Sequence, residues 1–160
     1  MEALEKIRQH PLYVENYKKL EDAEANRKFC RHQMTHLLDV ARIAYIRNLE
    51  ADMGLKKEVI YTAALLHDIG KFRQYEGGTP HEMAGKEIAE IILTDIAMFS
   101  QEEKEVILQA ILEHRGLVPG MTVLGRLLYE SDKLSRACYS CPAEAECSWS
   151  NEKKNTTIKY

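Results

Sequence analysis

No long hydrophobic run occurs in this 160-residue sequence. A helix that crosses a bilayer needs about 20 consecutive apolar residues, and no segment approaches that length. The first residues, MEALEKIRQHPLYVENY, also lack the apolar core of a secretory signal peptide. We therefore expect a cytoplasmic protein that does not associate with a membrane.

The sequence also has little excess charge of either sign. Its 22 Lys and Arg residues against 25 Asp and Glu residues give a formal net charge of -3. Broad attraction to nucleic acid requires a basic excess, so a nucleic-acid polymer is not an expected partner. A small phosphorylated substrate in a locally basic pocket is compatible with this charge. Nothing in the sequence specifies an oligomeric state.

Strand-type alternation, internal repeats and low-complexity segments are absent, whereas helical spacing of apolar residues is common. It occurs in MTHLLDVARIAYIRNLEA, KKEVIYTAALLHDI, HEMAGKEIAEIIL, QEEKEVILQAILEHRG and MTVLGRLLYESDKLSR. The glycines and proline of KFRQYEGGTP predict a loop between two of these segments. With 45% hydrophobic and 29% charged residues, the composition is that of a globular protein. We expect an all-α fold, a single-domain bundle of about five to seven helices.

Residue types that bind metals interrupt these apolar stripes. His36, His114 and Asp132 each fall on the apolar side of a helix, at three- or four-residue spacing from apolar residues. His67 and Asp68 end the most apolar helix, and at a helix end two neighbouring side chains could converge on one ion. An unpaired buried carboxylate costs about several kcal/mol, so these residues need partners. A divalent metal is the simplest one.

His81, in TPHEMAG, brings the candidate metal ligands to six: His36, His67, Asp68, His81, His114 and Asp132. Mixed nitrogen and oxygen ligands favour Fe or Mn, with Co, Ni or Zn as alternatives, over Ca. The centre could hold one ion or two, but six ligands exceed what one ion needs. We therefore expect two ions, bridged by Asp68, that activate water for attack on a phosphoester. Lys71, Arg73 and Arg115 lie close in sequence and could hold phosphates. Asp68, Lys71 and Arg115 are the expected catalytic residues.

The order of these residues resembles that of the HD superfamily of metal-dependent phosphohydrolases. The resemblance rests on THLLDVARIA, AALLHDIGK, AILEHRG and LLYESDKLSR, and it covers residues 30 to about 137. It implies a helical core in which His36, the His67–Asp68 pair and Asp132 bind one metal. His81 and His114 correspond to the extra ligands of the dinuclear members. The length of the chain suits one domain, so we expect residues 1–160 to form a single HD domain with a cysteine-containing C-terminal segment, 138–160.

Within the superfamily, the sequence is most similar to the bacterial branch that includes symmetrical dinucleoside tetraphosphatases. SDKLSR departs from the usual ending of that group, and the absence of a downstream Gly-Tyr-Pro signature argues against cyclic-di-GMP phosphodiesterase activity. A minority of the superfamily are di-iron oxygenases with nearly the same ligand order. We expect a phosphohydrolase that acts on a nucleotide or a related small phosphoester. The alternatives are an HD-fold di-iron oxygenase and a non-catalytic module that senses metal or redox state.

Cysteine is sparse, and in a reducing compartment thiols are free or metal-bound rather than paired. CYSCPAEAEC places Cys138, Cys141 and Cys147 in a C-x2-C-x5-C run, and Cys30 is the only other cysteine. If the two regions meet, these four residues could form a second metal site for Zn or an iron–sulfur cluster. The alternative is four reduced thiols in loops.

Two further polar features have simple interpretations. His32 stands four residues before His36 and could contact the site, although a local hydrogen-bonding or surface histidine is the simpler interpretation. The charged run KKLEDAEAN is most simply a solvated face.

Overall fold

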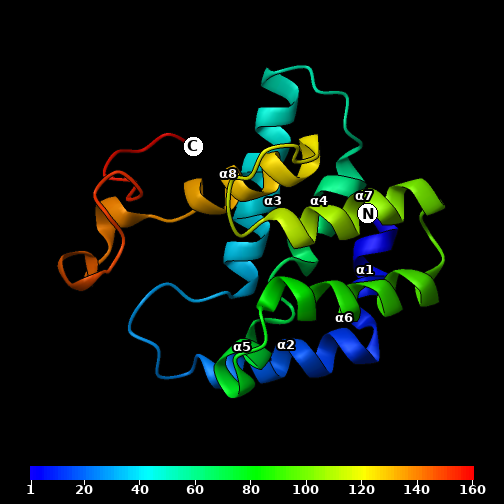
Figure 1. The fold of residues 1–160 in the computed structure, drawn as a ribbon, viewed down its shortest axis with the longest axis horizontal. Coiled ribbons are helices and arrows are strands. Elements are labelled where there is room, and N and C mark those ends of the chain that lie inside the picture. Colours follow the sequence, from blue (N-terminus) through cyan, green and yellow to red (C-terminus); the bar gives the residue numbers. More distant parts are fainter.

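The computed structural model describes residues 1–160 and consists of helices, with no strand (Figure 1). The α-helices are α1 (Glu2–Gln9), α2 (Pro11–Ala23), α3 (Met34–Glu50), α4 (Lys57–Leu66), α5 (Lys71–Gly77), α6 (His81–Ile96), α7 (Gln101–Glu113) and α8 (Val123–Leu134). Two 3-10 turns follow, Cys138–Ser140 and Glu144–Glu146. The all-α class is confirmed. None of the helices combines the length and the apolar character that a membrane crossing requires.

Local side-chain chemistry sets several helix ends. The Ser100 hydroxyl accepts a hydrogen bond from the Glu103 backbone N–H, and the Glu103 carboxylate accepts one from the Ser100 N–H, so α7 begins in a capping box. Thr122 caps α8 by accepting a hydrogen bond from the Gly125 N–H. Pro80 directly precedes α6, in agreement with its expected place near a helix start.

Residues 71–77 form α5, and our expectation of a loop throughout KFRQYEGGTP is wrong there. Phe72 is buried in the main core, and α5 packs against α2 and α6. This tertiary packing outweighs the glycines that suggested a loop. Gly78, with φ of 73°, ends the helix in the left-handed conformation that glycine adopts at little cost.

Helix α4 lies at the centre of the core. It packs against α1, α3, α7 and α8, and seven of its ten residues are buried. A helix that is apolar nearly all round requires such cover. The residues that directly follow α4 are therefore inside the molecule, and the exposed fractions of His67 and Asp68 are 0% and 2%.

Gly70 brings the turn after α4 against α6. A Cβ atom at residue 70 would lie 2.3 Å from the backbone nitrogen of Gly85 and 2.7 Å from the carbonyl carbon of Ala84. A Cβ atom at Gly85 would lie 3.3 Å from the carbonyl oxygen of His67. The two glycines thus allow a backbone approach that brings residues 67–70 close to α6, the helix that begins with His81.

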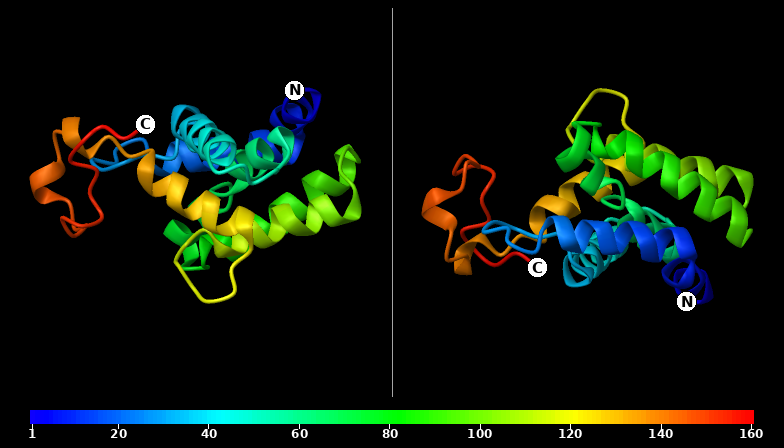
Figure 2. Two further views of the ribbon diagram at one scale, coloured as in Figure 1. Left: turned by 90° about the horizontal axis from the view of Figure 1, so that it is seen from above. Right: turned by 90° about the horizontal axis from the view of Figure 1, so that it is seen from below.

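Residues 138–160 form an irregular segment that lies beside the loop at residues 24–33 (Figure 2). Lys28 of that loop is 2.6 Å from the Glu146 carboxylate, and the Asn155 amide donates to the carbonyls of Lys133 and Arg136. Within the segment only Ala143 and Asn155 are buried. Apolar packing therefore contributes little to its position.

Replacing Gly70 by alanine is expected to lower the free energy of unfolding by about 1–3 kcal/mol, because the new methyl group would overlap the α6 backbone. Gly77→Ala is the matched control, since a Cβ there meets nothing within 4 Å and alanine favours the helix. Urea unfolding followed by circular dichroism should show the loss in the first variant only. Equal stability of the two variants would contradict the close approach to α6.

Candidate metal centre

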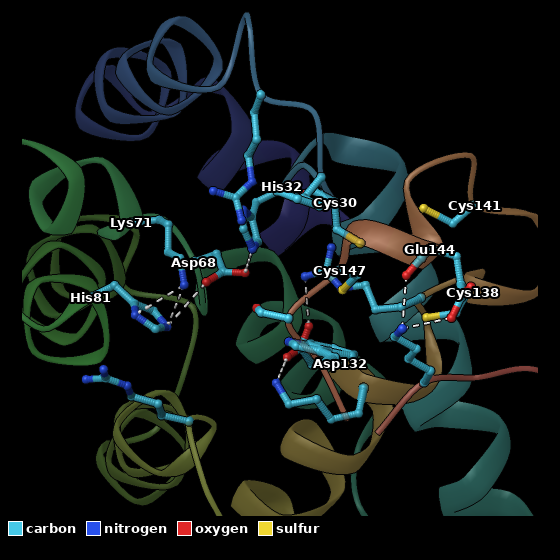
Figure 3. Close-up of a pocket in the computed structure, with 18 of the residues that line it drawn as sticks. Cys30, His32, Asp68, Lys71, His81, Asp132, Cys138, Cys141, Glu144 and Cys147 are labelled. Carbon is cyan, nitrogen blue, oxygen red and sulfur yellow. Dashed lines mark hydrogen bonds and ion pairs between the residues drawn. The ribbon is translucent and has the colours of Figure 1, made fainter. Parts of the chain in front are cut away.

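The six residues expected to bind metal meet at the centre of the fold. His36 lies on α3, Asp132 on α8, His67 and Asp68 after α4, His81 at the start of α6, and His114 at the end of α7. All six are buried, with exposed fractions of 8% or less. Figure 3 shows Asp68, His81 and Asp132 around one cavity. Sequence positions that span nearly 100 residues are thus brought within contact distance.

The ligand atoms form two groups that share Asp68. One consists of His36, His67, Asp68 and Asp132, and the other of Asp68, His81 and His114; within each, the atoms lie within 4.8 Å of one another. Asp68 Oδ2 is 2.9 Å from His67 Nε2 and 3.7 Å from His36 Nε2. Its other oxygen, Oδ1, is 3.6 Å from His81 Nε2 and 3.8 Å from His114 Nε2. A carboxylate oriented in this way could bridge two cations.

Hydrogen bonds at Nδ1 determine which nitrogen each ring presents to the centre. His67 Nδ1 donates to the carbonyl of Ala64 at 2.6 Å, and His114 Nδ1 donates to the carbonyl of Ile111 at 2.5 Å. A carbonyl oxygen can only accept, so a proton is on Nδ1, and in the neutral ring Nε2 presents a lone pair. Both rings are therefore held in the tautomer that binds a metal through Nε2.

His36 is oriented by the same principle. The Ser135 hydroxyl donates to the carbonyl of Asp132 at 2.7 Å and therefore accepts from His36 Nδ1 at 3.1 Å. His36 Nε2 then faces Asp132 Oδ1 at 3.3 Å. Three rings on three different elements thus present lone pairs toward the same region.

Two features of the centre are explained by a bound cation. His67 Nε2 is buried and has no hydrogen-bond partner. His81 Nε2 lies 2.9 Å from His114 Nε2, although Gln74 Oε1 accepts from His81 Nδ1 at 2.6 Å and both Nε2 atoms then carry lone pairs. Facing lone pairs repel one another unless a cation is bound by them. The donor set therefore fits divalent transition-metal ions.

Both carboxylates are held in the ionised form. Burial raises the pKa of Asp68, but the surrounding histidines, His67 and His32 first, lower it by more and hold it well below its usual range. Burial also raises the pKa of Asp132, and His36, Arg136 and Lys133 outweigh that effect. The guanidinium of Arg136 lies 3.2 Å from Asp132 Oδ1 and 3.0 Å from His36 Nε2. Ionised carboxylates supply the negative charge that binds a divalent ion.

A buried chain of hydrogen bonds beside the centre was missed at the level of sequence. His32 is buried, with Nε2 3.7 Å from Asp68 Oδ2, and its Nδ1 bonds Glu24. Glu24 also accepts from the His32 backbone N–H at 2.7 Å and from the Tyr75 hydroxyl at 2.6 Å. Burial raises the pKa of Glu24, but these bonds lower it by more, to about 2. The solvated face expected for KKLEDAEAN is therefore wrong at Glu24, which orients His32 toward Asp68.

A pocket of about 500 Å³ opens onto the two ligand groups. Six basic side chains line it: Arg27, Lys71, Arg115, Lys133, Arg136 and Lys154. Lys71 Nζ is 3.4 Å from His81 Nδ1, and burial lowers the pKa of its ammonium group. Arg115 is more exposed and pairs with Glu82 at 3.1 Å. Arg73 lies outside the pocket and pairs with Glu87.

All four cysteines line the same pocket, and none forms a disulfide. No three of their sulfur atoms lie within 4.8 Å of one another, unlike the ligand atoms of the two His and Asp groups. The structure therefore brings the expected second set of metal ligands to one region, with a wider spacing than in the His and Asp groups.

Comparisons with known proteins agree with this geometry. A family model of the HD domain matches residues 34–137, a range that includes all six candidate ligands. An uncharacterized protein of Clostridium beijerinckii is 49% identical over 148 residues, which is 92% of each chain. Ribonuclease Y of Acetivibrio thermocellus is 30% identical over 128 residues, 80% of this chain, but the match spans only 22% of that protein.

The fold also has a counterpart among solved structures. A crystal structure described as a predicted HD superfamily hydrolase, from an uncultured Thermotogales bacterium, matches with a TM-score of 0.63. The match covers 96% of this chain and 87% of the other, at 21% sequence identity. At that identity the likeness shows a shared fold.

Replacing Glu24 by glutamine is expected to destabilise the protein by about 1–3 kcal/mol near neutral pH, because a buried acceptor of three hydrogen bonds loses its charge. The pKa of Glu24 is about 2 in the fold against an ordinary 4.5, so its ionisation stabilises the fold fully above pH 4.5. That contribution is lost as pH falls from 4.5 toward 2. The difference in unfolding free energy between wild type and Glu24→Gln should shrink over this range.

Urea unfolding at several pH values measures that difference. Glu21→Gln is the matched control, because Glu21 is exposed near the end of the same helix and forms no ion pair. A loss of stability in Glu24→Gln that stays constant with pH would contradict an ionised Glu24.

Proposed function

The chain belongs to the HD domain family, and we propose that it is a metal-dependent phosphohydrolase that acts on a nucleotide or a related small phosphoester. The observation that carries this proposal is the pair of ligand groups that share Asp68 within a pocket lined by basic side chains. A divalent centre beside cationic walls suits a substrate whose reacting atom carries negatively charged oxygens.

In this proposal, His36, His67, Asp68 and Asp132 hold one divalent ion, and His81 and His114 share Asp68 with a second. Fe or Mn suits this mixture of imidazole and carboxylate, as do Co, Ni and Zn. When bound, such ions lower the pKa of water and neutralise charge on phosphoryl oxygens.

Lys71 has the role of binding a phosphoryl oxygen and offsetting the negative charge that develops during hydrolysis. Its position supports this role, since Nζ reaches His81 from the pocket wall and is largely screened from solvent. An ammonium group in such a place interacts with phosphate more strongly than one at the surface. Arg115, which is 54% exposed, would contact a more distant part of the substrate.

Backbone carbonyls keep two of the histidine ligands in one tautomer. The carbonyls of Ala64 and Ile111 retain the Nδ1 protons of His67 and His114. Neither ring needs to exchange a proton or rotate before its Nε2 atom can act. The site is therefore preorganised for an incoming phosphate group.

The size of the pocket favours a small substrate. About 500 Å³ is within the usual range for small-molecule sites, about 300–1,000 Å³. Its six basic side chains could bind more than one phosphate. The similarity to ribonuclease Y makes short single-stranded RNA the second candidate, but the net charge of -3 weakens attraction to a polymer.

Turnover of a panel of nucleotides, dinucleotides and short RNA, followed by liquid chromatography, tests the proposal. The Mn- or Fe-loaded wild type should release phosphate-containing products from a small substrate. Asp68→Asn should lower kcat at least about 100-fold, because it removes the charge that both ligand groups share. Lys6→Ala, exposed on α1 outside the pocket, should retain activity. Full activity of a folded Asp68→Asn variant would refute the proposal, and turnover of RNA alone would replace it with a ribonuclease.

The number of ions gives a separate test. Metal analysis after gel filtration should find about two ions per wild-type chain and about one in His81→Ala, since His81 belongs only to the second group. His10→Asn is the control, because His10 lies outside the centre and asparagine keeps its role as the cap of α2. Equal metal content in His81→Ala and wild type would contradict a two-ion centre.

A further inference from the structure

All four cysteines of the chain line one pocket, although they come from two distant segments. Cys30 lies in the loop between α2 and α3, whereas Cys138, Cys141 and Cys147 lie in the irregular C-terminal segment. Figure 3 shows the four side chains on the same side of the cavity. Four thiols gathered in this way are a complete ligand set for a metal site, and the HD centre does not use them.

The two segments that carry the cysteines have few other means of holding together. The C-terminal segment has no α-helix, and only Ala143 and Asn155 in it are buried. The Lys28–Glu146 ion pair that joins the segments is exposed, and such a pair contributes about 0–1 kcal/mol. A segment without a core usually needs a disulfide or a metal to fix its position. The cysteines form no disulfide.

The thiols are too widely spaced for one zinc ion to bind them as they lie. One tetrahedral zinc ion, with bonds of about 2.3 Å, holds its sulfurs within about 4 Å of one another. No three of these thiols lie within 4.8 Å of one another. An iron–sulfur cluster of the cubane type binds each thiolate at a different iron, so it accepts a wider arrangement.

Basic and acidic side chains both lie near the thiols. Arg136 and Lys154 line the same pocket but are paired with Asp132 at 3.2 Å and with Glu144 at 2.8 Å, whereas Arg27 is in no ion pair. Arg27 donates to the backbone carbonyl of Cys30 at 2.8 Å and so shapes the loop that carries this cysteine. Arg27 is therefore the basic group that would offset part of the negative charge of a bound cluster.

We propose that Cys30, Cys138, Cys141 and Cys147 bind a four-iron iron–sulfur cluster that fastens the C-terminal segment to the loop before α3 and completes one wall of the pocket. The cluster is taken up by ligand exchange from a thiol carrier. Each cysteine forms one iron–sulfur bond and passes its proton to the carrier thiolate that leaves, and no electron is transferred.

The test uses the full chain, purified without oxygen and incubated with a preassembled four-iron, four-sulfide cluster carried by small thiols. About four irons and four acid-labile sulfides per chain are expected after gel filtration, with visible absorption typical of such clusters. Sulfide is the decisive quantity, because the His and Asp groups could bind iron but not sulfide. Fluorescence of Trp149, the single tryptophan and part of the same pocket, should be quenched on uptake.

Cys30→Ala and Cys147→Ala should each retain less than about one tenth of the sulfide, whereas Ser140→Ala, an exposed change between two of the cysteines, should retain all of it. Circular dichroism and metal content at the His and Asp groups report whether each variant is folded. Absence of sulfide from the wild type, zinc in its place, or full sulfide in folded Cys30→Ala would each overturn the proposal. These outcomes do not depend on phosphohydrolase activity.

Discussion

The burial of two ionised carboxylates inside a helical bundle is the constraint on which this structure depends. Asp68 and Asp132 are 2% and 5% exposed, and charges so far from water are costly unless cations and hydrogen-bond donors surround them. The fold provides those partners from several elements: α4 ends inside the core, α6 begins there, and α7 ends there. The glycines at residues 70 and 85 allow these ends to approach. The packing of the core and the geometry of the site thus both serve to give the two buried carboxylates their partners.

Features with a local cause could be predicted from the sequence. The apolar spacing of residues 34–50 specifies α3, and the Ser100 and Glu103 pair specifies the start of α7. His36, His114 and Asp132 could be found because each interrupts an apolar pattern, and His67 and Asp68 because they end an apolar helix. His81 interrupts no such pattern and could be assigned only through the resemblance to a known ligand order. His67 and Asp68 lie in the turn that follows the helix end at Leu66, and both side chains reach the same centre from there.

Features that depend on tertiary contacts could not be predicted in this way. Helix α5 exists because Phe72 is buried against other helices, while its sequence suggests a loop. Glu24 lies in a run of charged residues, and its sequence neighbours give no sign that it is buried. Its burial depends on hydrogen bonds to His32 and Tyr75, which no helical spacing connects to it. Cys30 lies in the same pocket as the other three cysteines, and no local sequence pattern predicts this. A sequence indicates which residues need partners more readily than it indicates where those partners are.

Because Asp68 belongs to both ligand groups, the affinities of the two groups are thermodynamically linked. The group with Asp132 has two carboxylates, while the other has two imidazoles and a share of Asp68, so the first would fill at lower metal concentration. An ion already bound in the first group would withdraw charge from Asp68 and so lower the affinity of the second group for its ion. Occupancy would therefore rise in two steps as metal supply increases. The shared carboxylate would then make the number of bound ions depend on the metal supply.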